Sequence, residues 1–212
     1  MAEQLTLTLA GSPEPTFENY VAGRNGEALD ALVRIARHAI AETGLVVWGA
    51  GGAGKTHLLK AAVALAREHG REARFVAEPS LLEDAGPVRD IFIAVDTVDR
   101  ADDVAQAKLF TLYNVLAACG GQLVAAASVP PARMSLRDDL RTRLGWGLVI
   151  EVLPLTDAEK PEALAAYAQS RGFRLPADAI AYLLAHSRRD MASLVATLAA
   201  LDKHSLALQR PV

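Results

Sequence analysis

The chain has 212 residues, 51% of them hydrophobic, which is enough for one moderate domain and a smaller appendage with buried cores. Its formal net charge of −3 excludes a globally basic surface, so strong sequence-independent binding to nucleic acid is not expected. A single cysteine excludes an internal disulfide and indicates a reducing compartment. No basic leader and no uninterrupted apolar run of about 18 residues occurs, so we expect a cytoplasmic protein that does not enter a membrane.

Residues 1–14 are predicted to be a flexible tail. They contain an alternating stretch, Gln-Leu-Thr-Leu-Thr-Leu at 4–9, followed by Gly11 and Pro13, which break regular structure. An extended tail of this kind can place alternate leucines in an apolar groove of a partner while its main chain pairs along the edge. The alternative is an ordinary edge strand of the chain's own sheet.

The segment from 26 to 42 is predicted to be an amphipathic helix, with Asn25 as its N-cap. Five apolar segments after it are predicted to be strands: 45–48, 73–77, 91–95, 122–127 and 148–152. Helical patterns separate most of them, the clearest at 102–118. Apolar strands that alternate with helices predict a mostly parallel sheet covered on both faces.

After residue 154 the pattern becomes entirely helical. Three helices are predicted at 157–171, 176–186 and 190–203, and Pro161 delays the start of the first. Together they form a small lid of about 55 residues that must pack on the larger domain. The expected organisation is a tail at 1–14, an α/β domain at 15–153 and an all-helical lid domain at 154–212.

The segment 49–56 matches the P-loop pattern G-x-x-x-x-G-K-[ST] completely, and it lies between an apolar strand and a helix. Such a loop turns backbone N–H groups toward a phosphate chain, here from Gly49, Gly51, Gly52, Ala53 and Gly54. We expect Lys55 to reach the β- and γ-phosphates of ATP or ADP, and Thr56 to bind Mg²⁺. His57 follows as a packing residue beside the nucleotide. A glycine-rich turn that binds nothing is the alternative.

The acid on the Mg²⁺ side of the site is predicted to be Asp96, because it directly follows the apolar run 91–95. The alternative is an aspartate that merely ends a strand. Most active ATPases of this architecture carry a second acid next, but Thr97 stands there, and Asp99 is expected to point elsewhere. Intrinsic hydrolysis should therefore be slow.

In their order and spacing, these motifs resemble the AAA+ module of the DnaA-like family of replication initiators. The segments that carry the resemblance are TFENYVAGRN at 16–25, GAGGAGKTHLL at 49–59, the strand ending at Asp96, SVPPARM at 128–134, LRTRLGWGLV at 140–149 and RRDMASLVATL at 188–198. The resemblance covers about residues 16–201 and implies a P-loop AAA+ sheet flanked by helices, followed by a helical lid. Within the family, the chain looks most like the regulatory inactivators of DnaA, the Hda group.

The resemblance implies two arginine roles that composition alone would not suggest, since helical arginines are usually exposed surface charge. Arg143 aligns with the arginine finger, which acts in a neighbouring subunit's site, and Arg141 is its rival. Arg189 aligns with the lid arginine, sensor 2, that contacts the nucleotide phosphates, and Arg188 is its rival.

Further positions near the nucleotide follow from the resemblance. Ser128 occupies the sensor-1 position, where the family more often has an acidic or amide side chain, and this departure weakens the case for vigorous self-hydrolysis. Phe17, Tyr20 and Val21 lie in the box that packs on the adenine. Without the resemblance, these three side chains would be ordinary core.

The implied function is negative regulation of replication initiation. Gln4, Leu5, Leu7 and Leu9 match the family's segment that binds the sliding clamp, the β subunit of DNA polymerase III. Docked on the DNA-loaded clamp and so associated with the nucleoid, the protein would use Arg143 to stimulate hydrolysis of DnaA-bound ATP, while holding ADP in preference to ATP itself.

Other assemblies and functions stay open. A homodimer is a further assembly, and direct DNA contact is expected to be weak or indirect. The rival functions are a helicase loader or remodelling ATPase with its own turnover, a P-loop kinase and a purely structural adaptor.

Overall fold

The computed structural model of the protein describes residues 14–83, 89–187 and 190–208, with side chains described up to residue 201 apart from residue 192. The chain divides into two compact units between Thr156 and Asp157, and each unit has an apolar core of its own. Among the described helices, none is both long enough and apolar enough to cross a membrane.

The first unit is built on five parallel strands in the order β2-β3-β4-β1-β5. The strands are β1 (Gly44–Trp48), β2 (Ala73–Val76), β3 (Phe92–Val95), β4 (Gln122–Ala127) and β5 (Leu148–Glu151). Successive residues of a strand face opposite sides, so Phe92 and Ala94 of β3 enter one core and Ile93 and Val95 enter the other. The predicted parallel α/β sheet is confirmed.

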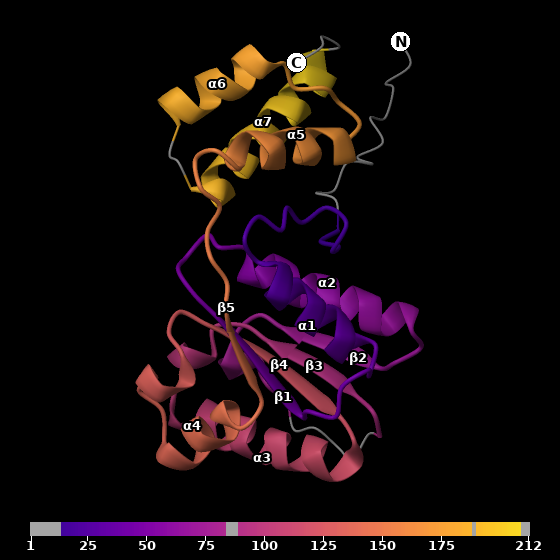
Figure 1. Ribbon diagram of the computed structural model, residues 1–212, viewed down its shortest axis with the longest axis vertical. Helices are drawn as coiled ribbons and strands as arrows, with labels where there is room; N and C mark the ends of the chain where they lie inside the picture. Colours follow the sequence, from indigo (N-terminus) through magenta and orange to yellow (C-terminus); the bar gives the residue numbers. More distant parts are fainter. Residues whose placement is uncertain (1–13, 84–88, 188–189, 209–212) are drawn as a thin grey trace, which may run out of the picture. The chain divides into compact units, whose positions relative to one another are not determined.

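Helices cover both faces of this sheet, as Figure 1 shows. On one face lie α1 (Gly26–Ala36) and α2 (Lys55–Glu68), and on the other lie α3 (Asp103–Cys119) and α4 (Asp138–Gly145). Three 3₁₀ turns join the elements: η1 (Pro79–Leu81), η2 (Val98–Arg100) and η3 (Pro131–Arg133). Because all strands are parallel, their carboxyl ends meet at one edge, and the loops after β1, β3 and β4 converge there.

Helix α1 ends six residues earlier than the apolar pattern predicts. His38 takes a left-handed conformation (φ 55°), its N–H bonds to the Ile35 carbonyl oxygen, and the Ala39 N–H bonds to that of Arg34. This is the closing geometry of a Schellman motif. The buried Arg71 donates from Nη1 to the carbonyl oxygens of Ile35 and Ala36, at 2.9 and 3.1 Å. The end of α1 is therefore fixed by a side chain that lies far along the sequence.

The second unit is all-helical, as predicted, with α5 (Lys160–Ser170), α6 (Ala177–His186) and α7 (Met191–Leu208). Pro161 lies in the first turn of α5, where a missing N–H costs nothing because that group has no helical partner. The core of this unit consists of Leu164, Ala168, Leu175, Ile180, Leu183, Leu194 and Leu198.

Asn25 precedes α1 as predicted, but its side chain does not cap the helix. Instead Nδ2 donates to the Leu153 carbonyl oxygen at 2.9 Å, and Oδ1 accepts the Leu153 N–H at 2.8 Å. Asn25 is 3% exposed, and both bonds are part-buried. The Asn25 side chain thus bonds to both main-chain groups of Leu153, just beyond β5, as a neighbouring strand would.

We expect Asn25→Ala to lower the free energy of unfolding by about 2 kcal/mol, because it leaves the half-buried N–H and C=O of Leu153 without the side chain that bonds to both. Urea unfolding followed by circular dichroism measures the change. Asn114→Ala, at a half-exposed position of α3, is the matched control and should shift stability by less than about 0.5 kcal/mol. Equal effects of the two substitutions would contradict this role for Asn25.

Candidate functional site

The loop between β1 and α2 depends on its first and last glycines. A Cβ added to Gly49 would lie 2.2 Å from the Val152 carbonyl oxygen, and one added to Gly54 would lie 2.7 Å from Cε2 of Tyr20. Gly54 also has a φ of +90°, which residues with a side chain rarely adopt. The loop is thus held closely between the chain after β5 and the N-terminal segment, with no space for side chains at these two positions.

Lys55 and the first turn of α2 give the loop its positive character. Lys55 Nζ donates to the carbonyl oxygens of Gly49 and Ala50, at 2.7 and 2.9 Å. Burial lowers the pKa of Lys55, while the negative charges of Asp96 and Asp99 oppose that shift. The leading N–H groups of α2 have no helical acceptors, and the helix dipole adds partial positive charge at the same place. An ammonium group and a helix N-terminus therefore converge on one loop, which fits a phosphate chain.

Thr56 and Asp96 are brought into direct contact although 40 residues separate them. Thr56 Oγ1 donates to Asp96 Oδ2 at 2.5 Å, and Asp96 Oδ1 accepts the Thr97 N–H at 2.8 Å. Asp96 is only 6% exposed. A hydroxyl and a carboxylate are oxygen ligands of the kind Mg²⁺ prefers. No group of three or more His, Cys, Asp or Glu residues with metal-binding placement occurs in the described part of the chain.

The segment before α1 packs onto the P-loop and the first turns of α2. Tyr20 donates its hydroxyl to the Ala53 carbonyl oxygen at 3.2 Å and accepts a bond from Asn25 Nδ2 at 3.3 Å. His57 Nε2–H donates to the Thr16 carbonyl oxygen at 2.8 Å, and the His57 and Tyr20 ring centroids are 5.4 Å apart.

The side chains of the predicted adenine box are half-buried in this segment. Phe17 and Tyr20 contact the core beneath α1 and α2, and Val21 is also half-buried. This segment therefore lies beside the loop, with the two aromatic side chains already packed on core.

The sequence suggested that Asp99 points away from the site, but in the structure it does not. Its Oδ2 accepts the Ser128 N–H at 3.1 Å and also accepts a bond from the Ser128 hydroxyl. Thr97 makes this possible by adopting a left-handed conformation (φ 52°), which is rare for a β-branched residue. This turn after β3 places Asp99 against Ser128, the residue that follows β4. Sequence reasoning missed this pair because nothing in Thr97 favours the required conformation.

The structure distinguishes Arg143 from its rival Arg141. Arg141 forms an ion pair with Asp138 at 2.7 Å. The Arg143 guanidinium instead lies 4.1 Å from the centroid of the Trp146 ring and 5.8 Å from that of Phe110. Among the residues that the structure describes, no carboxylate forms an ion pair with Arg143. The guanidinium of Arg143 therefore packs on aromatic faces, which do not neutralise its charge, so it can still pair with an incoming anion.

Several predicted residues lie outside the described part of the chain. These are Gln4, Leu5, Leu7 and Leu9 of the tail, and Arg188 and Arg189 of the second unit. Their predicted roles stay predictions.

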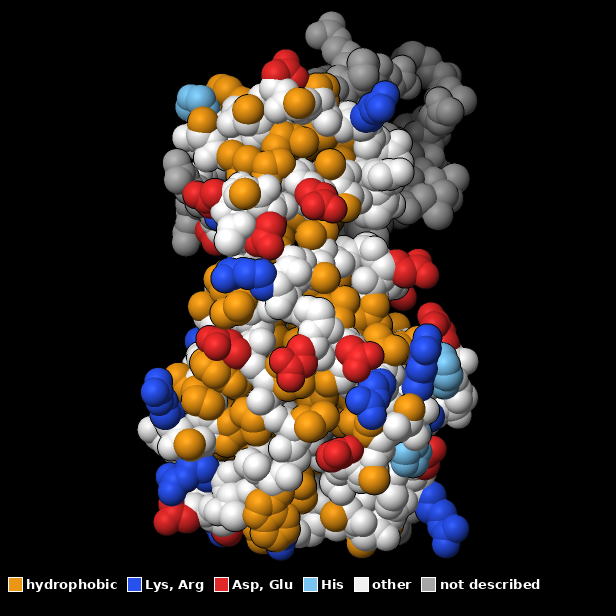
Figure 2. All heavy atoms as spheres, viewed as in Figure 1, with side chains coloured by type: hydrophobic (Ala, Val, Ile, Leu, Met, Phe, Trp, Pro, Cys, Tyr) orange, Lys and Arg blue, Asp and Glu red, His pale blue; other side chains and the backbone are white. Residues whose placement is uncertain are grey.

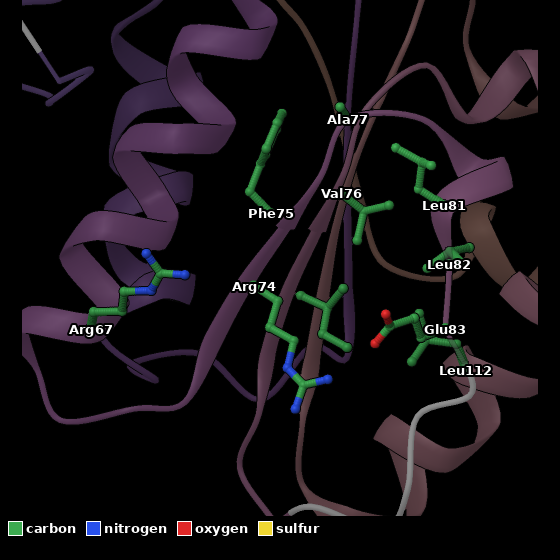
Figure 3. A pocket seen from close by; sticks show the side chains of 10 residues that line it. Arg67, Arg74, Phe75, Val76, Ala77, Leu81, Leu82, Glu83 and Leu112 are labelled. Carbon is green, nitrogen blue, oxygen red and sulfur yellow. The ribbon is translucent and has the colours of Figure 1, made fainter. Parts of the chain in front are cut away.

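A hollow of about 460 Å³ lies along β2, away from the P-loop. Figure 3 shows Arg67 and Phe75 on one side of the strand, and Leu81, Leu82 and Glu83 on the other. Neither the P-loop residues nor Asp96 and Ser128 line it.

In the view of Figure 2, basic and acidic side chains are interspersed, so the face of the protein seen there has no large patch of a single charge.

Two family models match the chain in separate ranges. The model described as the bacterial DnaA ATPase domain matches residues 12–79, and the model described as the lid domain of Hda matches residues 157–212. The first range contains the P-loop, and the second contains the three helices of the second unit. Together the two ranges cover more than half of the chain.

Solved structures of replication initiators share this fold. Domain III of DnaA from Thermotoga maritima is 21% identical, with a TM-score of 0.80, and the match covers 94% of this chain and 92% of that one. AMPPCP-bound DnaA from Aquifex aeolicus is 19% identical, with a TM-score of 0.71 and coverage of 91% and 66%. The chain thus spans slightly less than two thirds of that longer initiator.

A motor protein has a related architecture. The RuvB Holliday junction branch migration motor of Thermotoga maritima is 16% identical, with a TM-score of 0.68 and coverage of 94% and 67%. At this identity, the likeness concerns the fold alone.

We expect the stability of the protein to fall as the pH drops from 7.5 to 5.5, in part through His57. Burial lowers the pKa of His57, opposed by its bond to the Thr16 carbonyl and assisted by the charge of Lys60. The unfolded chain, with a histidine pKa of about 6.5, then binds the proton more readily than the folded one. This contribution is present above about pH 6.5 and is lost as the pH falls toward the folded-state pKa.

Urea midpoints at the two pH values measure this loss. His57→Gln should reduce the pH dependence, whereas His69→Gln, at the exposed far end of α2, should leave it unchanged. Identical pH dependence in wild type and His57→Gln would show that His57 does not contribute.

Proposed function

The chain belongs to the Hda/DnaA-like AAA+ family, and we propose that it is a nucleotide-bound regulator that stimulates hydrolysis of the ATP held by DnaA. The observation that carries this proposal is the Arg143 guanidinium, which is held over the Trp146 ring without an ion pair among the described residues. The match of the second unit to the lid of Hda supports the choice of regulator over initiator.

The P-loop would hold ADP or ATP. Lys55 would contact the phosphates, Thr56 and Asp96 would hold Mg²⁺, and the segment with Phe17, Tyr20 and Val21 would lie against the base. Bound Mg²⁺ would neutralise phosphate charge. Because Thr97 stands where a second acid would orient water, we propose that this chain turns over ATP slowly and holds ADP for long periods.

Arg143 would act in the site of a neighbouring molecule rather than in its own. It belongs to α4, which covers the opposite face of the sheet from the P-loop helix α2. A guanidinium placed against the transferring phosphoryl group stabilises the charge that spreads over its oxygens. Stacking on Trp146 orients Arg143 without neutralising it, whereas the ion pair with Asp138 would have to break before Arg141 could serve.

The proposed partners are DnaA and the sliding clamp. The tail residues Gln4, Leu5, Leu7 and Leu9 would add a short extended segment to a groove of the clamp, with leucines as anchors. The clamp would then bring the chain to DNA in the cytoplasm, near the nucleoid, and no strong DNA contact of its own is needed. A homodimer is a further assembly in which Arg143 would meet a second copy of the P-loop.

We expect the chain, together with clamp loaded on DNA, to increase the hydrolysis rate of DnaA-bound ATP. Arg143→Ala should reduce the stimulated rate by roughly 10³-fold or more, because it removes the positive charge from the transition state. Release of labelled phosphate from DnaA–ATP measures the rate. The melting temperature of the variant should stay within about 3 °C of wild type, since only the cation–π contacts with Trp146 and Phe110 are lost.

Arg141→Ala is the matched control, because it removes an arginine from the same helix that is already paired with Asp138. It should retain most of the stimulation. Loss of stimulation in Arg141→Ala alone would transfer the role to that residue. No stimulation by wild type, with good ATP turnover by the chain alone, would favour a loader or remodelling ATPase instead.

The tail is tested separately by Gln4→Ala combined with Leu7→Ala. We expect clamp affinity to fall by at least about tenfold, because two anchor side chains are lost, while nucleotide affinity is unchanged. Surface plasmon resonance on immobilised clamp gives the affinity. Thr6→Ala with Thr8→Ala alters the alternate positions of the same stretch and should bind almost normally, and an unchanged affinity of the anchor variant would refute the assignment.

A further inference from the structure

Strand β2 leaves one edge of the sheet open, because it is the end strand and pairs with β3 alone. The carbonyl oxygens of Glu72 and Val76 accept bonds from the neighbouring chain of β3. Alternate residues of a strand bond in opposite directions, so the main-chain groups of Ala73 and Phe75 face the free edge. Arg67 of α2 already donates to the Ala73 carbonyl oxygen, from Nε at 2.9 Å and from Nη2 at 2.8 Å. The part of the edge that can still pair therefore begins at Phe75.

The hollow of about 460 Å³ lies at this edge and reaches both faces of the sheet. Arg67 lines it from α2, which covers one face, and Leu112 lines it from α3, which covers the other. Figure 3 shows the strand between these two sides. The two helix layers thus leave a space in line with the sheet, where a further strand would lie.

The wall of the hollow on the α3 side is apolar. It includes Val76, Leu81, Leu82 and Leu112. Lys108 of α3 donates from Nζ to the Leu82 carbonyl oxygen at 2.8 Å, which holds the chain after η1 against the helix. Leu81 is 62% exposed, so apolar surface is open to a partner here. This wall fits apolar side chains.

The α2 side of the hollow is basic. Lys60 and Arg67 are seven residues apart on α2 and therefore lie on one face of that helix. Lys60 Nζ lies 5.2 Å from the centroid of the Phe75 ring, and Arg67 bonds to the main chain of Ala73. Within the described ranges of the chain, neither side chain forms an ion pair. Both positive charges are thus available to an acidic partner.

The charges on the α3 side do not offer the same attraction. Arg74 forms an ion pair with Glu72, and Glu83 adds a negative charge where the hollow meets the apolar wall. An acidic side chain is therefore favoured on the α2 side and disfavoured on the α3 side.

We propose that this hollow is the docking site of a partner protein that supplies an extended segment with alternating acidic and apolar side chains. The segment would add to β2 as a sixth strand, pairing from Phe75 onward. Successive side chains of a strand point to opposite faces, so its acidic residues would meet Lys60 and Arg67 while its apolar residues pack on the leucines. The chain's own alternating stretch at 4–9 carries no charge, so it does not supply what the α2 side requires.

The experiment measures binding of the fluorescein-labelled peptide Glu-Val-Glu-Val-Glu-Val to the full chain by fluorescence anisotropy. We expect its Kd to be at least about tenfold lower than that of Lys-Val-Lys-Val-Lys-Val, because like charges would meet on the basic side. Glu-Glu-Glu-Val-Val-Val has the same composition but cannot serve both sides, and should also bind at least about tenfold more weakly. No binding, or equal affinity for the three peptides, would overturn the proposal.

Methylation of alternate peptide nitrogens tests the strand addition itself. Only every second N–H of the peptide would face β2, so methylating one alternate set should weaken binding at least about tenfold, and methylating the other set should change it by less than about threefold. Equal effects of the two sets would contradict pairing with the edge of β2.

Two pairs of variants at exposed positions locate the site. Lys60→Glu should weaken binding of the alternating peptide at least about tenfold, whereas Arg133→Glu, in η3, should stay within about twofold of wild type. Leu81→Ser should weaken binding at least about threefold, whereas Val104→Ser, at a 67% exposed position that does not line the hollow, should not. Circular dichroism checks that each variant is folded. Normal binding by folded Lys60→Glu and Leu81→Ser would overturn the site.

Other occupants of the hollow would be recognised with the same materials. If the chain's own tail filled the hollow, Gln4→Ala with Leu7→Ala would raise the peptide affinity by at least about threefold, because an intramolecular competitor is lost. If a second copy filled it, sedimentation would show a dimer that Leu81→Ser converts to a monomer. Either result would overturn the assignment to a partner protein.

Discussion

The position of β1 between β4 and β5 constrains the rest of the candidate site. It pairs with β4 on one side and β5 on the other, so that Trp48 lies opposite both Ala127 and Glu151. Directly beyond Trp48, Gly49 bonds to the Ala127 carbonyl and passes so close to Val152 that no side chain fits. A slip of one residue in either pairing would move each side chain of β1 from the core on one face of the sheet to the core on the other, and would displace the loop.

The bonds that shape the site join segments distant in sequence. Thr56 and Asp96 are 40 residues apart, Ser128 and Asp99 are 29 apart, and Asn25 and Leu153 are 128 apart. None of these contacts can form within one element, so the site is completed only when the parallel sheet has formed. Parallel pairings of this kind are slow to form, because loop closure precedes the stabilising contacts. The geometry of the phosphate loop is thus a property of the whole first unit.

Short-range sequence patterns predicted the elements whose formation depends mainly on neighbouring residues. The P-loop, the five apolar strands and the helices of the second unit follow from short-range spacing, and all of them occur in the structure. The end of α1 did not follow, because Arg71 from a later segment occupies its last carbonyl groups. The position of Asp99 did not follow either, since it requires Thr97 in a conformation that threonine disfavours. Trp146 is 64% exposed and serves as the surface on which Arg143 lies.

The contact between Arg143 and Trp146 also has an optical consequence. The chain contains two tryptophans, and the other, Trp48, lies half-buried at the end of β1. The indole of Trp146 is largely open to water and has a guanidinium 4.1 Å from its centre, so its fluorescence depends on what surrounds that arginine. Any molecule that draws Arg143 away, or covers it, changes the emission of Trp146. The protein thus carries a built-in spectroscopic reporter of engagement at Arg143, readable without an added label.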